Sequence, residues 1–178
     1  MNQEPTPAQK IIEVAKTYNL TMELKFIPWS KSRDAHLKVP SLNWKVTLSN
    51  KHRQITIDYT MGHGHCKSRL VPGKRTLLVN WSAIKNECED GKARQANIGR
   101  TGTMHPGPKL EDVLACLAAD ATVLDYPSFE EWALEFGYDS DSRKDEKIYH
   151  DCLEQALKLR SMLGEKGLSE LVDAAQGY

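Results

Sequence analysis

The sequence predicts a single α+β domain over residues 1–178, with an N-terminal helix, a small antiparallel sheet of three or four strands, a basic insertion and a C-terminal helical bundle. Apolar and polar residues alternate in three short runs before residue 60, and this period of two is typical of half-buried strands. After residue 109 apolar residues recur every three or four positions, which is typical of helices packed on a core. A chain of 178 residues also buries enough surface to fold without disulfides or metals.

The first helix is expected over residues 6–18, where the apolar positions fall on one face. Pro7 suits its first turn, because proline lacks the N–H group that a first turn leaves without a helical partner. Asn19 is the expected end, since asparagine tolerates the left-handed backbone that follows many helices.

Three strands are expected over residues 20–27, 43–49 and 55–59. The second and third flank the short polar segment 50–52, an arrangement that predicts an antiparallel hairpin. The alternation predicts that one face of the sheet is covered and the other open. A short apolar run at 77–81 is a candidate fourth strand.

Residues 67–108 form a basic, partly irregular insertion in which glycine and proline recur. Its cationic side chains suit contact with phosphates or with an acidic protein surface. The insertion residues that we expect to bind a partner are Lys67, Arg69, Lys74, Arg75, Lys92, Arg94 and Arg100.

Residues 109–178 form the helical part. A stripe of apolar residues predicts a helix over 110–125, and a shorter helix is expected over 128–136. Ser128 is the expected N-cap of the shorter helix, and Gly137 its end. The aromatic face of this helix comprises Phe129, Trp132, Ala133 and Phe136.

The longest helix is expected to start at Ser142 and to stop at Gly164, with a last short helix over 168–175. Its apolar face carries Ile148 and Cys152, and we expect the aromatic face of the preceding helix to pack on it as a hairpin. Asp139, Asp141 and Asp145 with Glu146 are alternative cation ligands, but the glycine and glutamate of an EF-hand loop are absent. We therefore predict that these residues cap the helix.

The net charge of zero conceals two oppositely charged parts. Residues 1–108 carry 17 Lys and Arg against 8 Asp and Glu, a balance of +9, and residues 109–178 carry 7 against 16, a balance of −9. Either the two parts neutralise each other on contact, or each presents charge of one sign to a partner. The acidic residues that we expect to bind a partner are Glu130, Glu131, Asp139 and Asp141.

His63, His65 and Cys66 are the weak candidates for metal ligands, because two histidines spaced by two residues point the same way on a strand. The alternative is that Gly62 and Gly64 bend the chain and that a histidine contacts the helix start at Asp112. No pair of cysteines has zinc-ligand spacing and no full set of catalytic groups is present, so we predict no cofactor and no enzymatic activity.

Four cysteines without a dense pattern predict free thiols in a reducing compartment. The polar start of the chain does not resemble a signal peptide, and no apolar run is long enough to cross a membrane. We therefore expect a cytoplasmic protein without a membrane partner.

Several motifs together resemble a family of small bacteriophage and prophage proteins. They are Tyr59-Thr-Met-Gly-His-Gly-His65, Asp112-Val-Leu114, Phe129-Glu-Glu-Trp132 and Gly137-Tyr-Asp-Ser-Asp-Ser-Arg-Lys144. The resemblance covers about half of the chain and implies a phage-encoded accessory protein in the host cytoplasm, but it transfers no catalytic residue.

With the segregated charge, the resemblance favours a non-catalytic inhibitor of a bacterial defence nucleoprotein complex, in the manner of anti-CRISPR proteins. The expected partner is a host protein or ribonucleoprotein complex. The alternatives are a nucleic-acid-binding accessory protein that acts through the insertion and, less favoured, a zinc-dependent enzyme.

Overall fold

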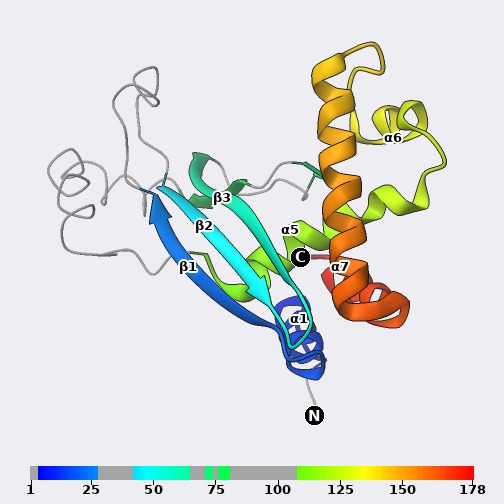
Figure 1. Ribbon diagram of the computed structural model, residues 1–178. Helices are drawn as coiled ribbons and strands as arrows, with labels where there is room; N and C mark the ends of the chain where they lie inside the picture. Colours follow the sequence, from blue (N-terminus) through cyan, green and yellow to red (C-terminus); the bar gives the residue numbers. More distant parts are fainter. Residues whose placement is uncertain (1–3, 28–41, 65–70, 74–75, 81–107) are drawn as a thin grey trace, which may run out of the picture.

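The computed structural model describes residues 4–27, 42–64, 71–73, 76–80 and 108–178 (Figure 1). In this part of the chain it confirms the α+β fold, with an N-terminal helix, a sheet and a group of C-terminal helices. Most of the basic insertion lies outside the described residues.

The sheet has four strands in the order β1-β2-β3-β4. Strands β1 (Thr21–Ile27), β2 (Leu42–Ser49) and β3 (Gln54–Gly64) are antiparallel, as predicted. The prediction was wrong for β4 (Thr76–Asn80), which pairs with β3 in parallel. A tight turn joins only antiparallel neighbours, and here the chain instead passes through a turn that the helices bind before it returns to the sheet.

One face of the sheet is covered and the other is polar, also as predicted. Trp44, Val46 and Leu48 of β2 are fully buried, while Lys45 between them is exposed. The turn between β2 and β3 is held by the Asn50 side chain, whose Oδ1 accepts hydrogen bonds from the backbone N–H groups of two turn residues at 3.0 Å. The Asn50 amide nitrogen donates to the carbonyl oxygen of Met162 at 3.0 Å, which ties the sheet to the helices.

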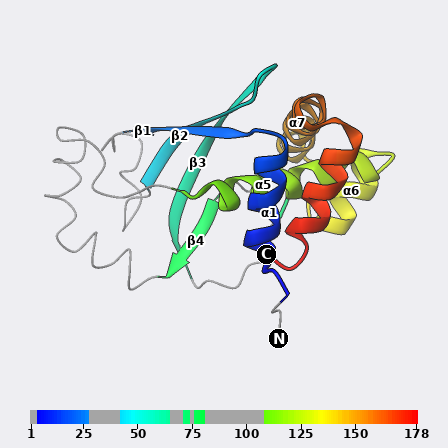
Figure 2. The same cartoon turned by 90° about the horizontal axis from the view of Figure 1, so that it is seen from below.

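Five helical segments pack to one side of the strands (Figure 2). They are α1 (Pro7–Thr17), α5 (Leu110–Ala121), the 3-10 helix η1 (Thr122–Asp125), α6 (Phe129–Phe136) and α7 (Arg143–Ala175). Helix α5 is buried on almost every side, because its many small and apolar residues allow close packing against α7 and α1.

Helix α7 contains the predicted break at Gly164, whose φ of 74° and ψ of 174° are not helical. The left-handed φ is accessible to glycine without the steric cost of a Cβ atom. The chain therefore turns at this residue, and the last helical residues fold back toward α1.

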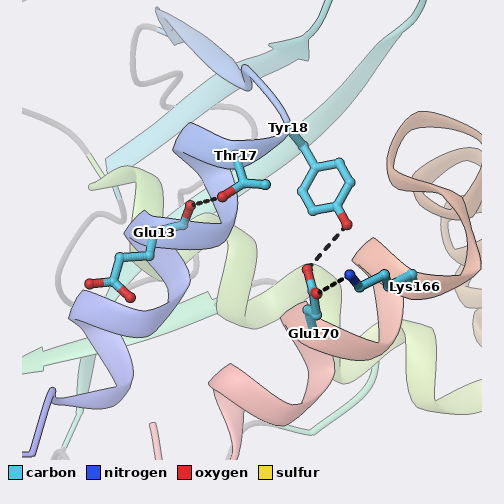
Figure 3. Close-up of polar contacts among 5 residues, drawn as sticks. All are labelled: Glu13, Thr17, Tyr18, Lys166 and Glu170. Carbon is cyan, nitrogen blue, oxygen red and sulfur yellow. Dashed lines mark hydrogen bonds and ion pairs between the residues drawn. The ribbon is translucent and has the colours of Figure 1, made fainter.

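Tyr18, directly after α1, contacts the second part of α7 (Figure 3). Its hydroxyl donates to Glu170 Oε2 at 3.1 Å, and Lys166 Nζ lies 3.6 Å from Glu170 Oε1. A Cβ atom at Gly167 would lie 2.6 Å from the Tyr18 ring, so the close approach of the two segments depends on this glycine.

Among the described helices, none combines the length and the apolar character that crossing a membrane requires.

Candidate interaction surface

Helix α6 has the amphipathic pattern that the sequence predicts. The Ser128 Oγ atom caps it by accepting a hydrogen bond from the backbone N–H of Glu131 at 3.3 Å, and Gly137 ends it with a φ of 73°. A rotation of about 100° per residue places its aromatic residues on one face and its glutamates on the other.

The inner face of α6 is fixed by aromatic packing. Trp132 is fully buried, and its ring stacks on Tyr138 with centroids 4.6 Å apart and planes 9° apart. Tyr149 of α7 meets the Trp132 ring edge-on at 5.4 Å and lies 5.6 Å from the Phe129 ring. Through these contacts the aromatic face of α6 meets α7 at Tyr149. The predicted hairpin packing on the Ile148 face stays a prediction.

The outer face of α6, which we call the acidic face, comprises Glu130, Glu131, Leu134 and Glu135. All four side chains are exposed, and Leu134 is 85% exposed. The helical rotation places Leu134 between Glu130 and Glu131 around the axis. This face therefore has a single apolar residue at its centre and charged residues around it, the general layout of an interface with an apolar core and a polar rim.

The predicted partner-binding residues did not include Leu134, although its position on the polar side of the helical pattern was visible in the sequence.

The stretch of sequence that contains the acidic face carries negative charges only. Between residues 110 and 142 the chain has nine Asp and Glu and no Lys, Arg or His. The backbone N–H of Glu130 and the Ser128 side chain hydrogen-bond the Glu130 carboxylate and lower its pKa. The charge at the start of the helix is therefore retained below the usual titration range of a glutamate.

The link between α6 and α7 caps the longer helix. The Ser142 Oγ atom accepts a hydrogen bond from the backbone N–H of Asp145 at 3.3 Å, and Asp145 Oδ2 accepts one from the N–H of Asp139 at 2.9 Å. Asp139 Oδ1 accepts from the N–H of Asp141 at 3.0 Å. The Ser142 bond confirms Ser142 as the N-cap, whereas the carboxylates of Asp139 and Asp145 bond backbone N–H groups within the link rather than those of the first helical turn. Both predicted binding residues of this link, Asp139 and Asp141, are exposed.

A second feature lies beneath α6, where residues 71–73, the anchor turn, are bound by the helices. The backbone N–H of Gly73 donates to Asp120 Oδ1 at 2.6 Å, and the Cys152 thiol lies 3.6 Å from the same oxygen. Asp120 is only 1% exposed, so its carboxylate needs hydrogen-bond donors from the protein, and these two groups are among them.

Gly73 leaves no room for a side chain. Its φ is +80°, and an added Cβ would lie 2.2 Å from Cγ2 of Ile148. The Ile148 side chain of α7 therefore lies directly against the anchor turn.

The Tyr138 hydroxyl completes the anchor by donating to the carbonyl oxygen of Pro72 at 2.5 Å. Burial, and then the nearby Cys152 and Asp120 groups, raise the pKa of Tyr138 to about 12. The phenol is therefore neutral at physiological pH and remains a hydrogen-bond donor.

A cavity of 590 Å³ opens beside the anchor turn. Its lining combines small residues of α5, the rings of Tyr126 and Phe136, and the end of α7. Tyr178 closes one side and hydrogen-bonds Asp112 through its hydroxyl. The Asp112 carboxylate also accepts a hydrogen bond from the backbone N–H of Lys109. At this helix start, where one alternative interpretation of the sequence places a histidine, Asp112 thus contacts Lys109 and Tyr178.

The remaining predicted site residues are not placed. Lys67, Arg69, Lys74, Arg75, Lys92, Arg94, Arg100, His65 and Cys66 lie outside the described residues. The backbone of His63 belongs to β3 and pairs with Val79, and Gly62 and Gly64 belong to the same strand. Within the described ranges, no three His, Cys, Asp or Glu side chains are grouped as a metal site.

The geometry thus identifies an exposed acidic face above a buried anchor. Comparison of the chain with family models, curated proteins and solved structures finds no match.

Proposed function

We propose that this protein is a non-catalytic, phage-encoded inhibitor whose acidic face binds the cationic surface of a bacterial defence nucleoprotein complex. The observation that carries the proposal is the exposed Leu134 among three glutamates on a helix whose other face is locked in the core. The phage origin rests on the motif resemblance described for the sequence.

The chemistry of the face suits a surface that normally holds nucleic-acid phosphates. Such surfaces are rich in Lys and Arg, and carboxylates presented by a rigid helix can replace phosphates as their partners. Leu134 supplies an apolar contact at the centre, where interface residues contribute most to affinity. The partner is thus a basic protein surface with an apolar depression.

The proposal predicts that binding depends strongly on salt. Opposite charges accelerate association, and added salt screens them over a Debye length of about 8–10 Å at physiological ionic strength. Affinity for the host complex should therefore fall steadily as salt is raised.

The test is capture of nuclease-treated bacterial lysate on immobilised protein, followed by elution with a salt gradient. Two variants address the face: Leu134→Ala, and the triple change of Glu130, Glu131 and Glu135 to Gln. A matched control changes the same number of exposed acids elsewhere, Glu13→Gln, Glu165→Gln and Asp173→Asn.

We expect both face variants to lose a captured nucleic-acid-binding protein that wild type and control retain. Capture that survives both face variants, or that resists salt, would contradict the proposal.

A second candidate is direct nucleic-acid binding through the insertion, favoured by its sequence. From Lys67 to Arg100 the chain has eight Lys and Arg against three Asp and Glu. Filter binding of labelled single- and double-stranded DNA and RNA separates the candidates. Affinity for free nucleic acid that is lost on changing Lys92, Arg94 and Arg100 to Ala would favour this second function.

A further inference from the structure

Strand β1 forms one margin of the sheet, and Figure 1 shows β2 along its inner side. No strand of the described residues pairs with its outer side. An edge of this kind presents backbone N–H and C=O groups to any chain that can align with them. Thr21, Glu23, Leu24 and Lys25 are all exposed.

The side chains of β1 alternate between the two faces of the sheet, and the two sets differ in chemistry. Leu24 pairs with Val46, so both lie on the apolar face; Val46 is fully buried and Leu24 is 36% exposed. Glu23 and Lys25 lie on the polar face, beside Thr47 and Lys45 respectively. The strand therefore leaves an apolar side chain on one face and two opposite charges on the other.

The charges in one row of the polar face are not balanced within a single molecule. Lys25 lies directly opposite Lys45, and Lys45 lies opposite Asp58 of β3. Like charges at directly opposed positions destabilise a sheet, and here two lysines share one aspartate in the row. A carboxylate on the outer side of Lys25 would balance the row.

We propose that two copies of this chain pair through β1 in an antiparallel arrangement, with the two-fold axis at Leu24. Leu24 is the middle residue of the seven in β1, so this register pairs the whole strand. It places Glu23 of each copy opposite Lys25 of the other and brings the two Leu24 side chains together. The row across the polar face becomes Asp58, Lys45, Lys25 and the partner's Glu23, with two acids outside two bases.

Neighbouring registers lack this match. An axis at residue 23 places two glutamates opposite each other, and an axis at residue 25 places two lysines opposite each other. Each also shortens the paired segment. The charges of β1 therefore favour the same register as the one that pairs the most residues. Opposite charges in one register and like charges in the others make an edge strand specific for its partner.

The test is sedimentation equilibrium over a concentration series, combined with amide hydrogen exchange of residues 21–27. We expect a reversible dimer and slower exchange in β1 as concentration rises. Glu23→Lys and Lys25→Glu should each raise the dimer dissociation constant by about tenfold or more, because each creates two like-charge pairs. The double variant should return it to within about threefold of wild type, because it restores both opposite-charge pairs.

Gln54→Lys is the matched control, since Gln54 is exposed on β3 and lies opposite Ser49 rather than at the outer edge. It should leave the dissociation constant unchanged. A wild-type protein that stays monomeric at the highest attainable concentration would overturn the proposal. So would a dimer that is insensitive to both single reversals, or a double variant that does not recover.

Discussion

The two faces of α6 differ in burial and in charge. On the inner face Trp132 is fully buried against Tyr138 and Tyr149, and the anchor turn lies beneath these residues. On the outer face Leu134 is 85% exposed, and the glutamates beside it are exposed as well. One short helix thus divides a buried, aromatic side from a charged side that is exposed.

Under the proposed function, stability and binding would be carried by separate residues. Substitutions on the inner face should change the free energy of unfolding, and those on the acidic face should change affinity alone. Rigid presentation matters for the second role, because a fixed helix loses little conformational entropy on binding.

The largest effect is expected for Trp132→Ala. Removing a fully buried tryptophan should lower the free energy of unfolding by about 4 kcal/mol, measured by urea denaturation. Leu134→Ala, two residues away, should change it by less than about 0.5 kcal/mol. Similar losses from both variants would show that the outer face also packs on something in the fold.

The next effect is expected at the anchor turn, for Gly73→Ala. The new Cβ would be strained by the φ of +80° and would overlap Cγ2 of Ile148, which together should cost about 3 kcal/mol. Gly137→Ala is the matched control, with a φ of +73° but open space around its Cα, and should cost only about 1 kcal/mol. Equal losses of stability in the two variants would mean that the anchor turn and Ile148 can shift to accommodate the new Cβ atom.

Tyr138→Phe should cost about 1.5 kcal/mol, because the carbonyl of Pro72 loses its donor. The substitution should also reduce the loss of folding stability at alkaline pH. The folded pKa of Tyr138 is raised from 10.0 to about 12, so the folded state favours the neutral phenol. The contribution of the neutral Tyr138 phenol to the free energy of unfolding is complete below pH 10 and is lost as the pH rises toward 12.

Denaturant titrations from neutral to alkaline pH measure this loss. Burial and the hydrogen bond to Asp112 also raise the pKa of Tyr178, so Tyr138→Phe should reduce the alkaline loss without abolishing it. An unchanged alkaline profile in Tyr138→Phe would contradict the assignment.

The smallest effect is expected for Ser142→Ala, which removes the N-cap of α7 and should cost about 1 kcal/mol. Ser140→Ala is the control, since Ser140 is exposed in the same link and no cap bond involves it. A thermal denaturation series is enough to compare them. A loss in the control equal to that in Ser142→Ala would show that the link, and not the cap, is sensitive.

The elements that follow from local chemistry were predictable from the sequence alone. The period of two in β2, the amphipathic period of α6 and the caps at Ser128 and Ser142 each depend on residues a few positions apart. The break at Gly164 is equally local, because it needs only a residue that tolerates a positive φ.

The way these elements meet depends on contacts between residues far apart in the chain. The bond from Gly73 to Asp120 joins residues 47 positions apart, and that from Tyr138 to Pro72 joins residues 66 apart. Nothing in the local pattern marks either pair, and the anchor they form also accompanies the parallel pairing of β4. Side-chain periodicity assigns a residue to a face of its own element, but the surface that this face meets is set by long-range packing of the whole chain.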